Sequence, residues 1–319
     1  MLTPFEESGT FSSIADSEDF LEALADAYPH VTLQRWGQPS GAVLTRLGMF
    51  TVTVGTGPVA GMVLGAIHGD EKSGREACMA FARDLAESID PGVQEYLTRH
   101  SWSILATANP SGTMADTRQN ANGVDLNRTY DDLVERETWT IDKWMKWAVP
   151  VLAVDLHEMW NSDLLSATAT GTVPSDGLAA LYPLGVELDG VVSDALQDAG
   201  YTYLPYSSLA SGTLRRDGSA RWKIVAQLVE VNREQGTLTQ RVNAHRVALG
   251  AALGHHRANT AEYEAAHLAA GGTGGGALPG GAPLPADQFV VLGGVPVPAV
   301  ATVIRGGVPV TLTGSAVVR

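Results

Sequence analysis

Residues with metal-binding side chains follow an apolar run near residue 60. The stretch VAGMVLGAI leads directly into HGDE, which places His68 and Glu71 three residues apart in a glycine turn. Imidazole nitrogens and carboxylate oxygens are common zinc ligands, and such a turn can aim both side chains at one point. A polar turn would give the same pattern by chance in a chain with eight histidines. The pair therefore needs support from elsewhere in the chain.

The stretch DLHE offers a third ligand. Asp155 and His157 alternate with apolar residues, so they share one face of a predicted strand. With His68 and one glutamate, His157 would complete a His₂Glu set that leaves a fourth zinc position for water. Glu158 is a rival to Glu71 for the glutamate position, because it directly follows His157. The residues alone leave this choice open.

A long polar loop is predicted over residues 109–130, where turn-forming residues dominate and periodicity is weak. It carries Arg118, Asn127 and Arg128. Guanidinium groups donate hydrogen bonds in a planar fork, so these side chains suit a carboxylate or a developing oxyanion. The alternative is a loop that its own polar groups stabilise.

Alternating strands and helices must position these residues. Continuous apolar runs such as VAGMVLGAI are typical of strands buried on both faces. Their alternation with helices predicts an α/β fold, a three-layer α/β/α arrangement with a mixed, mostly parallel central sheet. Ligands bind at the carboxyl ends of the strands in such sheets. Polar groups follow four predicted strands: His68 with Glu71, Asn109, His157 with Glu158, and Glu230.

Two helical segments carry further expectations. SEDFLEALADAYP is predicted to begin at an N-cap, Ser17, and to end before Pro29. A long helical region follows over residues 237–270, with adjacent His255 and His256 that do not share a helical face. We therefore expect no metal between these two histidines.

Composition limits the possible partners and location. The 319-residue chain has a formal net charge of −14, which argues against nucleic-acid binding. No apolar run reaches the roughly 20 residues of a membrane span, and no signal peptide is visible, so a cytoplasmic location without membrane contact is expected. The single cysteine, Cys78, is expected in the core and excludes an intramolecular disulfide.

The composition along the chain predicts three segments. Residues 1–270 are predicted to form the catalytic domain, residues 271–285 a Gly/Pro linker, and residues 286–319 a short β-rich tail of two or three strands. The tail is too small for a convincing independent domain. It is expected to dock on the main domain or to mediate a homo-oligomer through its strand edges.

The order of the motifs resembles a known family. HGDE, NPSG, NANGVDLNR, DLHE and LVEV follow one another with 86 residues from Glu71 to His157 and 73 from His157 to Glu230. In order and spacing the chain resembles the M14 (carboxypeptidase A-like) zinc metallocarboxypeptidases, from about residue 12 to about residue 262. The resemblance implies one zinc ion per chain and hydrolysis of a C-terminal peptide bond.

The resemblance also implies roles for individual residues. They are zinc ligands at His68, Glu71 and His157; a hydrogen bond from Asp125 to the first zinc histidine; oxyanion binding by Arg118; binding of the substrate's terminal carboxylate by Asn127 and Arg128; and general-base catalysis by Glu230.

Two positions depart from the family pattern or leave a choice open. The family's active-site tyrosine falls on Ser208, and Tyr206 lies two residues away as a possible substitute. Arg215 falls where the family reads the last side chain of the substrate, and Arg216 is an alternative. An arginine there predicts preference for an acidic terminal residue.

Other functions fit the same motifs. An aspartoacylase- or succinylglutamate desuccinylase-like amidohydrolase would cut N-acyl amino acids, and it shares the HGDE and DLH elements. That branch usually carries a larger β-domain after the catalytic glutamate, whereas a long helical segment follows Glu230 here. A cell-wall peptide amidase is a variant of the carboxypeptidase hypothesis. A peptide-binding pseudoenzyme is the non-enzymatic alternative. In the enzymatic cases the substrate is a peptide or N-acyl amino acid with a free carboxylate.

Overall fold

The structure is a computed structural model. It describes residues 1–41, 48–159, 166–170, 178–201, 203–205, 210–234, 236–273, 290–292, 295–297, 300–305 and 308–313. None of the helices in these ranges is long and apolar enough to cross a membrane. The cytoplasmic location stays a prediction.

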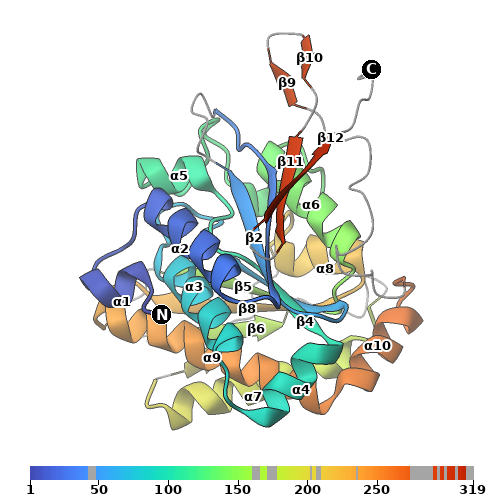
Figure 1. Ribbon diagram of the computed structural model, residues 1–319. Helices are drawn as coiled ribbons and strands as arrows, with labels where there is room; N and C mark the ends of the chain where they lie inside the picture. The colour runs from blue at the N-terminus through green and yellow to red at the C-terminus, as the bar shows by residue number, and fades with distance from the viewer. Residues whose placement is uncertain are drawn as a thin grey trace.

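An eight-stranded sheet forms the centre of the molecule (Figure 1). Four of its seven strand pairings are parallel, so the predicted mixed, mostly parallel sheet is confirmed. Its strands, in spatial order, are β1 (Val31–Gly37), β2 (Met49–Gly55), β4 (Ser101–Leu105), β3 (Val59–Gly65), β5 (Leu152–Met159), β8 (Val225–Asn232), β6 (Ser166–Thr170) and β7 (Tyr203–Pro205).

Helices cover both faces of the sheet, which gives the predicted three layers. The larger apolar cluster packs one face against α2 (Ile14–Ala27), α3 (Ser73–Ala86), α4 (Pro91–Arg99), α7 (Tyr182–Asp198) and α9 (Leu238–Ala258). The smaller cluster packs the opposite face against α6 (Arg136–Ala148) and α8 (Ser219–Trp222). The remaining helices are α1 (Pro4–Ser8), α5 (Pro110–Ala115), α10 (Thr260–Ala269) and two short turns, η1 (Leu126–Arg128) and η3 (Leu214–Gly218).

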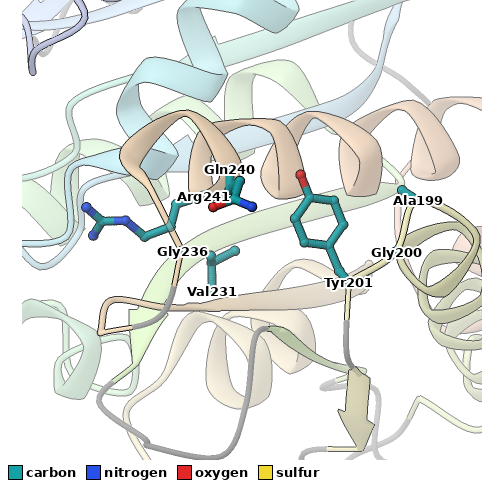
Figure 2. Close-up of a pocket in the computed structure, with 7 residues that line it drawn as sticks. All are labelled: Ala199, Gly200, Tyr201, Val231, Gly236, Gln240 and Arg241. Atoms are coloured by element: carbon teal, nitrogen blue, oxygen red, sulfur yellow. The ribbon is translucent and has the colours of Figure 1, made fainter.

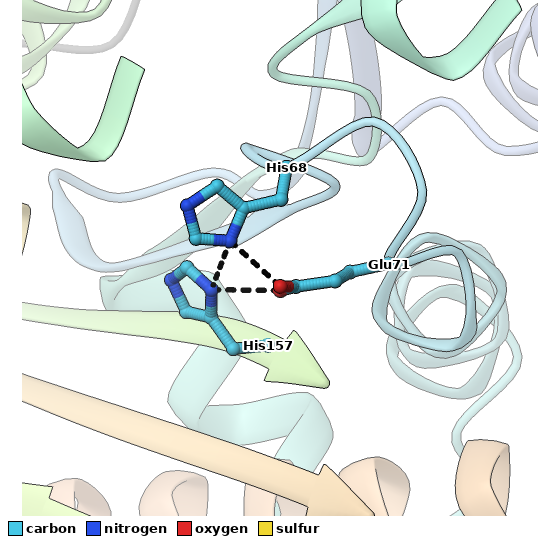
Figure 3. A group of neighbouring side chains, drawn as sticks. All are labelled: His68, Glu71 and His157. Atoms are coloured by element: carbon cyan, nitrogen blue, oxygen red, sulfur yellow. Dashed lines mark hydrogen bonds and ion pairs between the residues drawn. The ribbon is translucent and has the colours of Figure 1, made fainter. Parts of the chain in front are cut away.

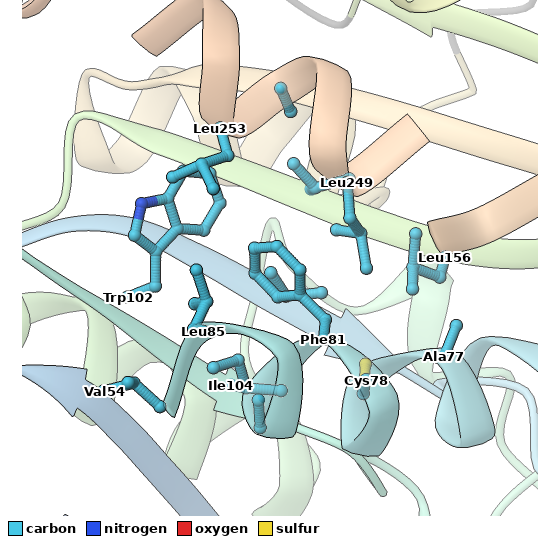
Figure 4. Packing of buried hydrophobic residues seen from close by; sticks show 14 of the residues in the cluster. Val54, Ala77, Cys78, Phe81, Leu85, Trp102, Ile104, Leu156, Leu249 and Leu253 are labelled. Atoms are coloured by element: carbon cyan, nitrogen blue, oxygen red, sulfur yellow. The ribbon is translucent and has the colours of Figure 1, made fainter. Parts of the chain in front are cut away.

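The larger cluster explains why β3 and its neighbours are almost wholly apolar. All seven residues of β3 are buried. Phe81 of α3 meets Trp102 of β4 edge to face at 5.5 Å between ring centroids, beside Leu249 and Leu253 of α9 (Figure 4). Cys78 lies in this layer with no exposed surface, as expected for a core residue. A sheet buried in this way is a rigid frame for residues at its carboxyl edge.

The beginning of α2 differs from the prediction. Ser13, not Ser17, is the N-cap: its hydroxyl accepts from the backbone N–H of Asp16, whose carboxylate bonds back to the Ser13 N–H. Ser17 lies inside the helix, and its hydroxyl donates to the Ser13 carbonyl at 2.9 Å. The reciprocal pair at Ser13 satisfies two backbone donors, which explains why the helix begins one turn earlier.

Three other elements refine the predictions. The loop at 109–130 contains α5 and η1, and the long helical region divides at Asn259 into α9 and α10. The tail contains four short strands in two hairpins, β9 (Val290–Leu292) with β10 (Val295–Val297) and β11 (Val300–Arg305) with β12 (Val308–Thr313), more than the two or three predicted. The predicted domain boundaries stay predictions.

Candidate active site

Three side chains that are far apart in the sequence converge at one point (Figure 3). The Nδ1 atoms of His68 and His157 lie 3.1 Å apart, and Glu71 reaches them with Oε1 at 2.8 Å and Oε2 at 2.9 Å, respectively. All three residues are buried. In the described part of the chain this is the one group of three or more such side chains that could hold a metal ion.

The β3–α3 turn presents the first two residues of the group. Its backbone N–H at Glu71 donates to the His68 carbonyl at 3.1 Å, which closes the turn. Ala66 just before it has a φ of 52°, a left-handed conformation that non-glycine residues rarely adopt. His157 comes from the carboxyl end of β5, which lies beside β3 in parallel. Adjacent parallel strands therefore bring the three side chains to one edge.

The outer nitrogen of each histidine faces a carboxylate. His68 Nε2 lies 3.2 Å from Asp125 Oδ1, and His157 Nε2 lies 2.9 Å from Asp155 Oδ2. A carboxylate behind an imidazole holds the hydrogen on the outer nitrogen, so the inner nitrogen keeps its lone pair for a metal. Two such imidazoles and one carboxylate form a donor set that fits zinc.

Glu158 does not compete with Glu71 for this point. Its backbone N–H donates to Glu71 Oε2 at 3.0 Å, while its side chain accepts from Arg241 of α9 at 2.9 Å. Successive residues of a strand point to opposite faces of the sheet. His157 therefore faces the smaller apolar cluster and Glu158 faces α9.

Glu230 is a further polar residue at this edge. It lies on β8 directly opposite His157 of β5, in the register of a parallel pair, so both side chains point to the same face. Burial, supported by the charge of Glu71 and opposed by His157, raises the pKa of Glu230 to about 7. A carboxyl group with a pKa near neutrality can both accept and return a proton.

Arg118 lies at the rim of the group. Its Nε donates to Asp125 Oδ2 at 3.0 Å, and its Nη1 lies 3.4 Å from Glu71 Oε1. Burial opposes ionisation of Asp125, but His68 and Arg118 together hold the pKa of that carboxyl below its usual range. The Arg118 side chain is 38% exposed, so it is partly accessible to solvent.

The turn η1 and the segment before η3 contact each other, and we call this pair of segments the η1–η3 wall. Asn127 accepts from the backbone N–H of Leu214 at 3.0 Å, and Arg128 donates to the Asn127 carbonyl at 2.6 Å. Gly212 has a φ of 77°, and a Cβ there would come within 2.4 Å of the Arg128 carbonyl oxygen. This close approach ties the segment that carries Arg215 to the pair Asn127–Arg128.

The two arginines of η3 differ in burial. Arg215 is 4% exposed, whereas Arg216 is half-buried. Tyr206 and Ser208, the candidates for the family tyrosine, lie outside the described residues.

The contact between Asp155 and His157 was not predicted from the sequence. Asp155 was placed on the same strand face as His157, but its contact with the histidine was not anticipated. The i, i+2 spacing on a strand is the signal that predicts such a contact.

A small cavity lies on the opposite face of the sheet (Figure 2). It measures about 140 Å³ and is bounded by the end of α7 and the first turn of α9, with Tyr201, Gln240 and Arg241 among its lining residues. Arg241 also contacts Glu158, which points away from the histidines. The cavity is therefore separate from the group formed by His68, Glu71 and His157.

Comparison with known proteins identifies the class. Residues 17–149 match the family model described as zinc carboxypeptidase (Peptidase_M14). Fold and site together define a metallocarboxypeptidase-like α/β protein. The resemblance read from the motifs is thus confirmed: residues 17–149 of this chain are similar to the M14 zinc carboxypeptidases.

Curated relatives match over short segments. Carboxypeptidase SOL1 of Arabidopsis thaliana is 33% identical over 95 residues, which is 26% of this chain and 19% of that protein. Murein peptide amidase A of Escherichia coli (strain K12) is 34% identical over 85 residues, 27% of this chain and 31% of the amidase. The matches thus span less than a third of the length of these relatives.

Solved structures share the fold over most of the chain. The carboxypeptidase A of Helicoverpa armigera superposes with a TM-score of 0.64 at 16% identity, over 78% of this chain and 74% of its own. A metallo-carboxypeptidase from Burkholderia cenocepacia gives 0.62 at 16% identity, over 76% and 69%. At this identity the likeness establishes the fold alone.

Proposed function

We propose that this protein is a zinc-dependent carboxypeptidase that hydrolyses the C-terminal amide bond of a peptide. The observation that carries the proposal is the convergence of His68, Glu71 and His157 beside Glu230 on one face of the sheet. A structural metal site would be closed by a fourth protein ligand, whereas three ligands with an adjacent carboxyl group suit catalysis.

The residues then have distinct tasks. When bound, zinc would supply Lewis acidity, lowering the pKa of water and polarising the scissile carbonyl. Glu230 accepts a proton from the attacking water and returns it to the leaving amine, which suits its pKa of about 7. Arg118 donates hydrogen bonds to the carbonyl oxygen as negative charge develops there.

The η1–η3 wall would recognise the end of the substrate. Asn127 and Arg128 lie together in η1 and would bind the terminal carboxylate through amide and guanidinium donors. Arg215 is attached to this wall through Gly212. A buried guanidinium there favours a terminal residue with an acidic side chain.

A second candidate is a cell-wall peptide amidase. The similarity to murein peptide amidase A and the arginine at position 215 favour it. It would use the same zinc centre on a peptide that contains an acidic residue. A homo-oligomer formed through the C-terminal tail also stays a proposal.

Substrate assays with metal analysis test the proposal. The purified protein would be assayed on peptides ending in Glu, Lys or Leu, on a murein peptide, and on N-acetylaspartate and succinylglutamate. We expect one zinc per chain, release of the terminal residue, and loss of activity with a chelator. Glu230→Gln should retain zinc and lose about 10²- to 10⁴-fold in kcat, the usual contribution of a general base. Cleavage of only the N-acyl amino acids would favour the amidohydrolase alternative, and zinc binding without any turnover would favour a pseudoenzyme.

Arg215→Ala tests the acidic preference. We expect the ratio of kcat/KM for Glu over Leu peptides to fall at least tenfold, with Arg216→Ala as the matched control. An unchanged ratio in Arg215→Ala would refute the assignment.

A further inference from the structure

Asp155 lies behind the second histidine of the metal-binding group. It precedes His157 by two residues on β5, so both side chains lie on the same face of the sheet. The carboxylate is 1% exposed, and its Oδ2 lies 2.9 Å from His157 Nε2. A charge buried to this degree is costly unless it is compensated. The contact with the histidine is therefore the feature to explain.

The orientation of the His157 ring determines where its hydrogen lies. Nδ1 faces the shared point, 3.1 Å from His68 Nδ1 and 2.9 Å from Glu71 Oε2. A nitrogen that binds a metal must offer a lone pair, so the hydrogen of the neutral ring must lie on Nε2. Asp155 is placed to accept that hydrogen.

A second neighbour of Nε2 cannot do so. Asn127 Nδ2 lies 3.2 Å from the same nitrogen. The amide oxygen of Asn127 is engaged by the backbone N–H of Leu214 at 3.0 Å, which directs the NH₂ group toward His157. An NH₂ group only donates, so it cannot accept the Nε2 hydrogen. Asp155 is the acceptor that remains.

The carboxylates behind the two histidines differ in their environment. Asp125 is 22% exposed and forms an ion pair with Arg118. Asp155 is buried, and its Oδ1 has no hydrogen-bond partner among the described residues. Its charge also reaches Tyr130 of the same core layer, where burial and then Asp155 raise the pKa of the phenol. The field of Asp155 is therefore less screened than that of Asp125.

We propose that Asp155 is a positioning residue that holds His157 in its metal-binding tautomer and strengthens zinc binding. The inference rests on the proposed zinc function and adds a residue to it. Asp155 contacts His157 but is not one of the three side chains that could hold the metal, so it acts through His157. Its loss should weaken zinc binding about 10- to 100-fold, as for other carboxylates behind metal-binding histidines.

Zinc affinity gives a readout that does not depend on turnover. Dissociation constants would be measured by competition with a chromophoric chelator for the full chain and for Asp155→Ala, Asp155→Asn and Asp142→Asn. Asp142 is the matched control, because it is also buried and accepts from a ring nitrogen, Trp222 Nε1, at 2.9 Å. It lies on α6 and is not part of the metal-binding group.

The Asp155 variants should separate the effect of the hydrogen-bond acceptor from that of the negative charge. We expect Asp155→Ala to lose 10- to 100-fold in zinc affinity and Asp155→Asn less, because the amide oxygen still accepts from Nε2. The visible spectrum of the cobalt-substituted protein should shift in both, and Asp142→Asn should match the unmodified protein. Equal melting temperatures of the zinc-free Asn variants would separate positioning from a general structural effect.

Three results would overturn the inference. Zinc affinity of Asp155→Ala within threefold of the unmodified protein refutes it while leaving the carboxypeptidase proposal intact. The same loss in Asp142→Asn would reduce Asp155 to a structural residue. An unmodified protein that binds no zinc would refute the proposed function itself, and this inference with it.

Discussion

Individual residues in the site derive their roles from the direction in which they point. Glu71 and Glu158 are both buried glutamates close to a histidine of the candidate metal site. Glu71 reaches both Nδ1 atoms, whereas Glu158 lies between Arg241 at 2.9 Å and Arg233 at 3.5 Å. The same type of side chain is thus a candidate metal ligand at position 71 and part of a buried ion pair at position 158.

Glu158→Gln tests this distinction. The variant removes the carboxylate that lies 2.9 Å from the largely buried Arg241, whereas Arg233 keeps its ion pair with Asp70, so the free energy of unfolding should fall by roughly 3 kcal/mol. Zinc stoichiometry should stay at one, because the side chain faces away from the histidines. Urea unfolding and metal analysis measure the two quantities, with Glu71→Gln as the comparison that loses zinc. A stable Glu158→Gln protein without zinc would mean that Glu158, not Glu71, is the ligand.

At the scale of elements, two irregular segments rather than regular helices build the η1–η3 wall, which is proposed to bind the substrate. The turn η1 and the segment before η3 meet where Gly212 packs on the Arg128 carbonyl. The N–H of Tyr130 donates to the Gly212 carbonyl at 3.0 Å, which adds a second link. These contacts hold Arg215 near Asn127 although 88 residues separate them in the chain.

Gly212→Ala should disturb this wall. The substitution is strained at a φ of 77°, and its Cβ would clash with backbone that cannot yield as a side chain could. We expect kcat/KM to fall about tenfold or more, mainly through KM, because Asn127, Arg128 and Arg215 would shift relative to the candidate metal site. Steady-state kinetics would show this, and zinc affinity should not change. A normal KM would show that the wall does not bind substrate.

At the scale of the whole molecule, buried histidines couple stability to pH. His256 of α9 lies between α4 and β4, where Trp102 Nε1 donates to the Tyr96 hydroxyl at 3.1 Å. That hydroxyl in turn lies 3.0 Å from His256 Nδ1. Burial, supported by the neighbouring His100 and His255, lowers the pKa of His256 to about 3. The folded protein therefore keeps this ring neutral.

The sign of the pH effect follows from this depressed pKa. Between about pH 6.5 and 3 the unfolded chain binds a proton at His256 that the folded chain does not. The contribution of His256 to the free energy of unfolding should therefore be complete above pH 6.5. Below pH 6.5 it should fall by about 1.4 kcal/mol per pH unit. His256→Asn keeps an acceptor for Tyr96 and should flatten the slope of unfolding free energy against pH by that amount. An unchanged slope in denaturant titrations at pH 4 to 7 would contradict the assignment.

Much of the candidate site could be predicted from the sequence, because the spacing of residues close together in the chain determines it. The His-x-x-Glu turn, the alternation of Asp155 and His157, and the arginine-containing loop all reflect short-range geometry. The cap of α2 was misplaced, because Ser13 and Ser17 both fit an N-cap and only their hydrogen bonds distinguish them. The short helix α5 was missed, because the turn-forming residues around it conceal a single helical turn.

The sequence by itself determined the α/β class, the buried parallel strands and the identity of the candidate ligands, since periodicity and side-chain chemistry are local properties. Only the tertiary structure decided which glutamate meets the histidines, that Glu230 lies opposite His157, and that Asp155 accepts from its ring. Those outcomes depend on strand order and register. Both arise from packing between segments that are tens of residues apart, which no local pattern records.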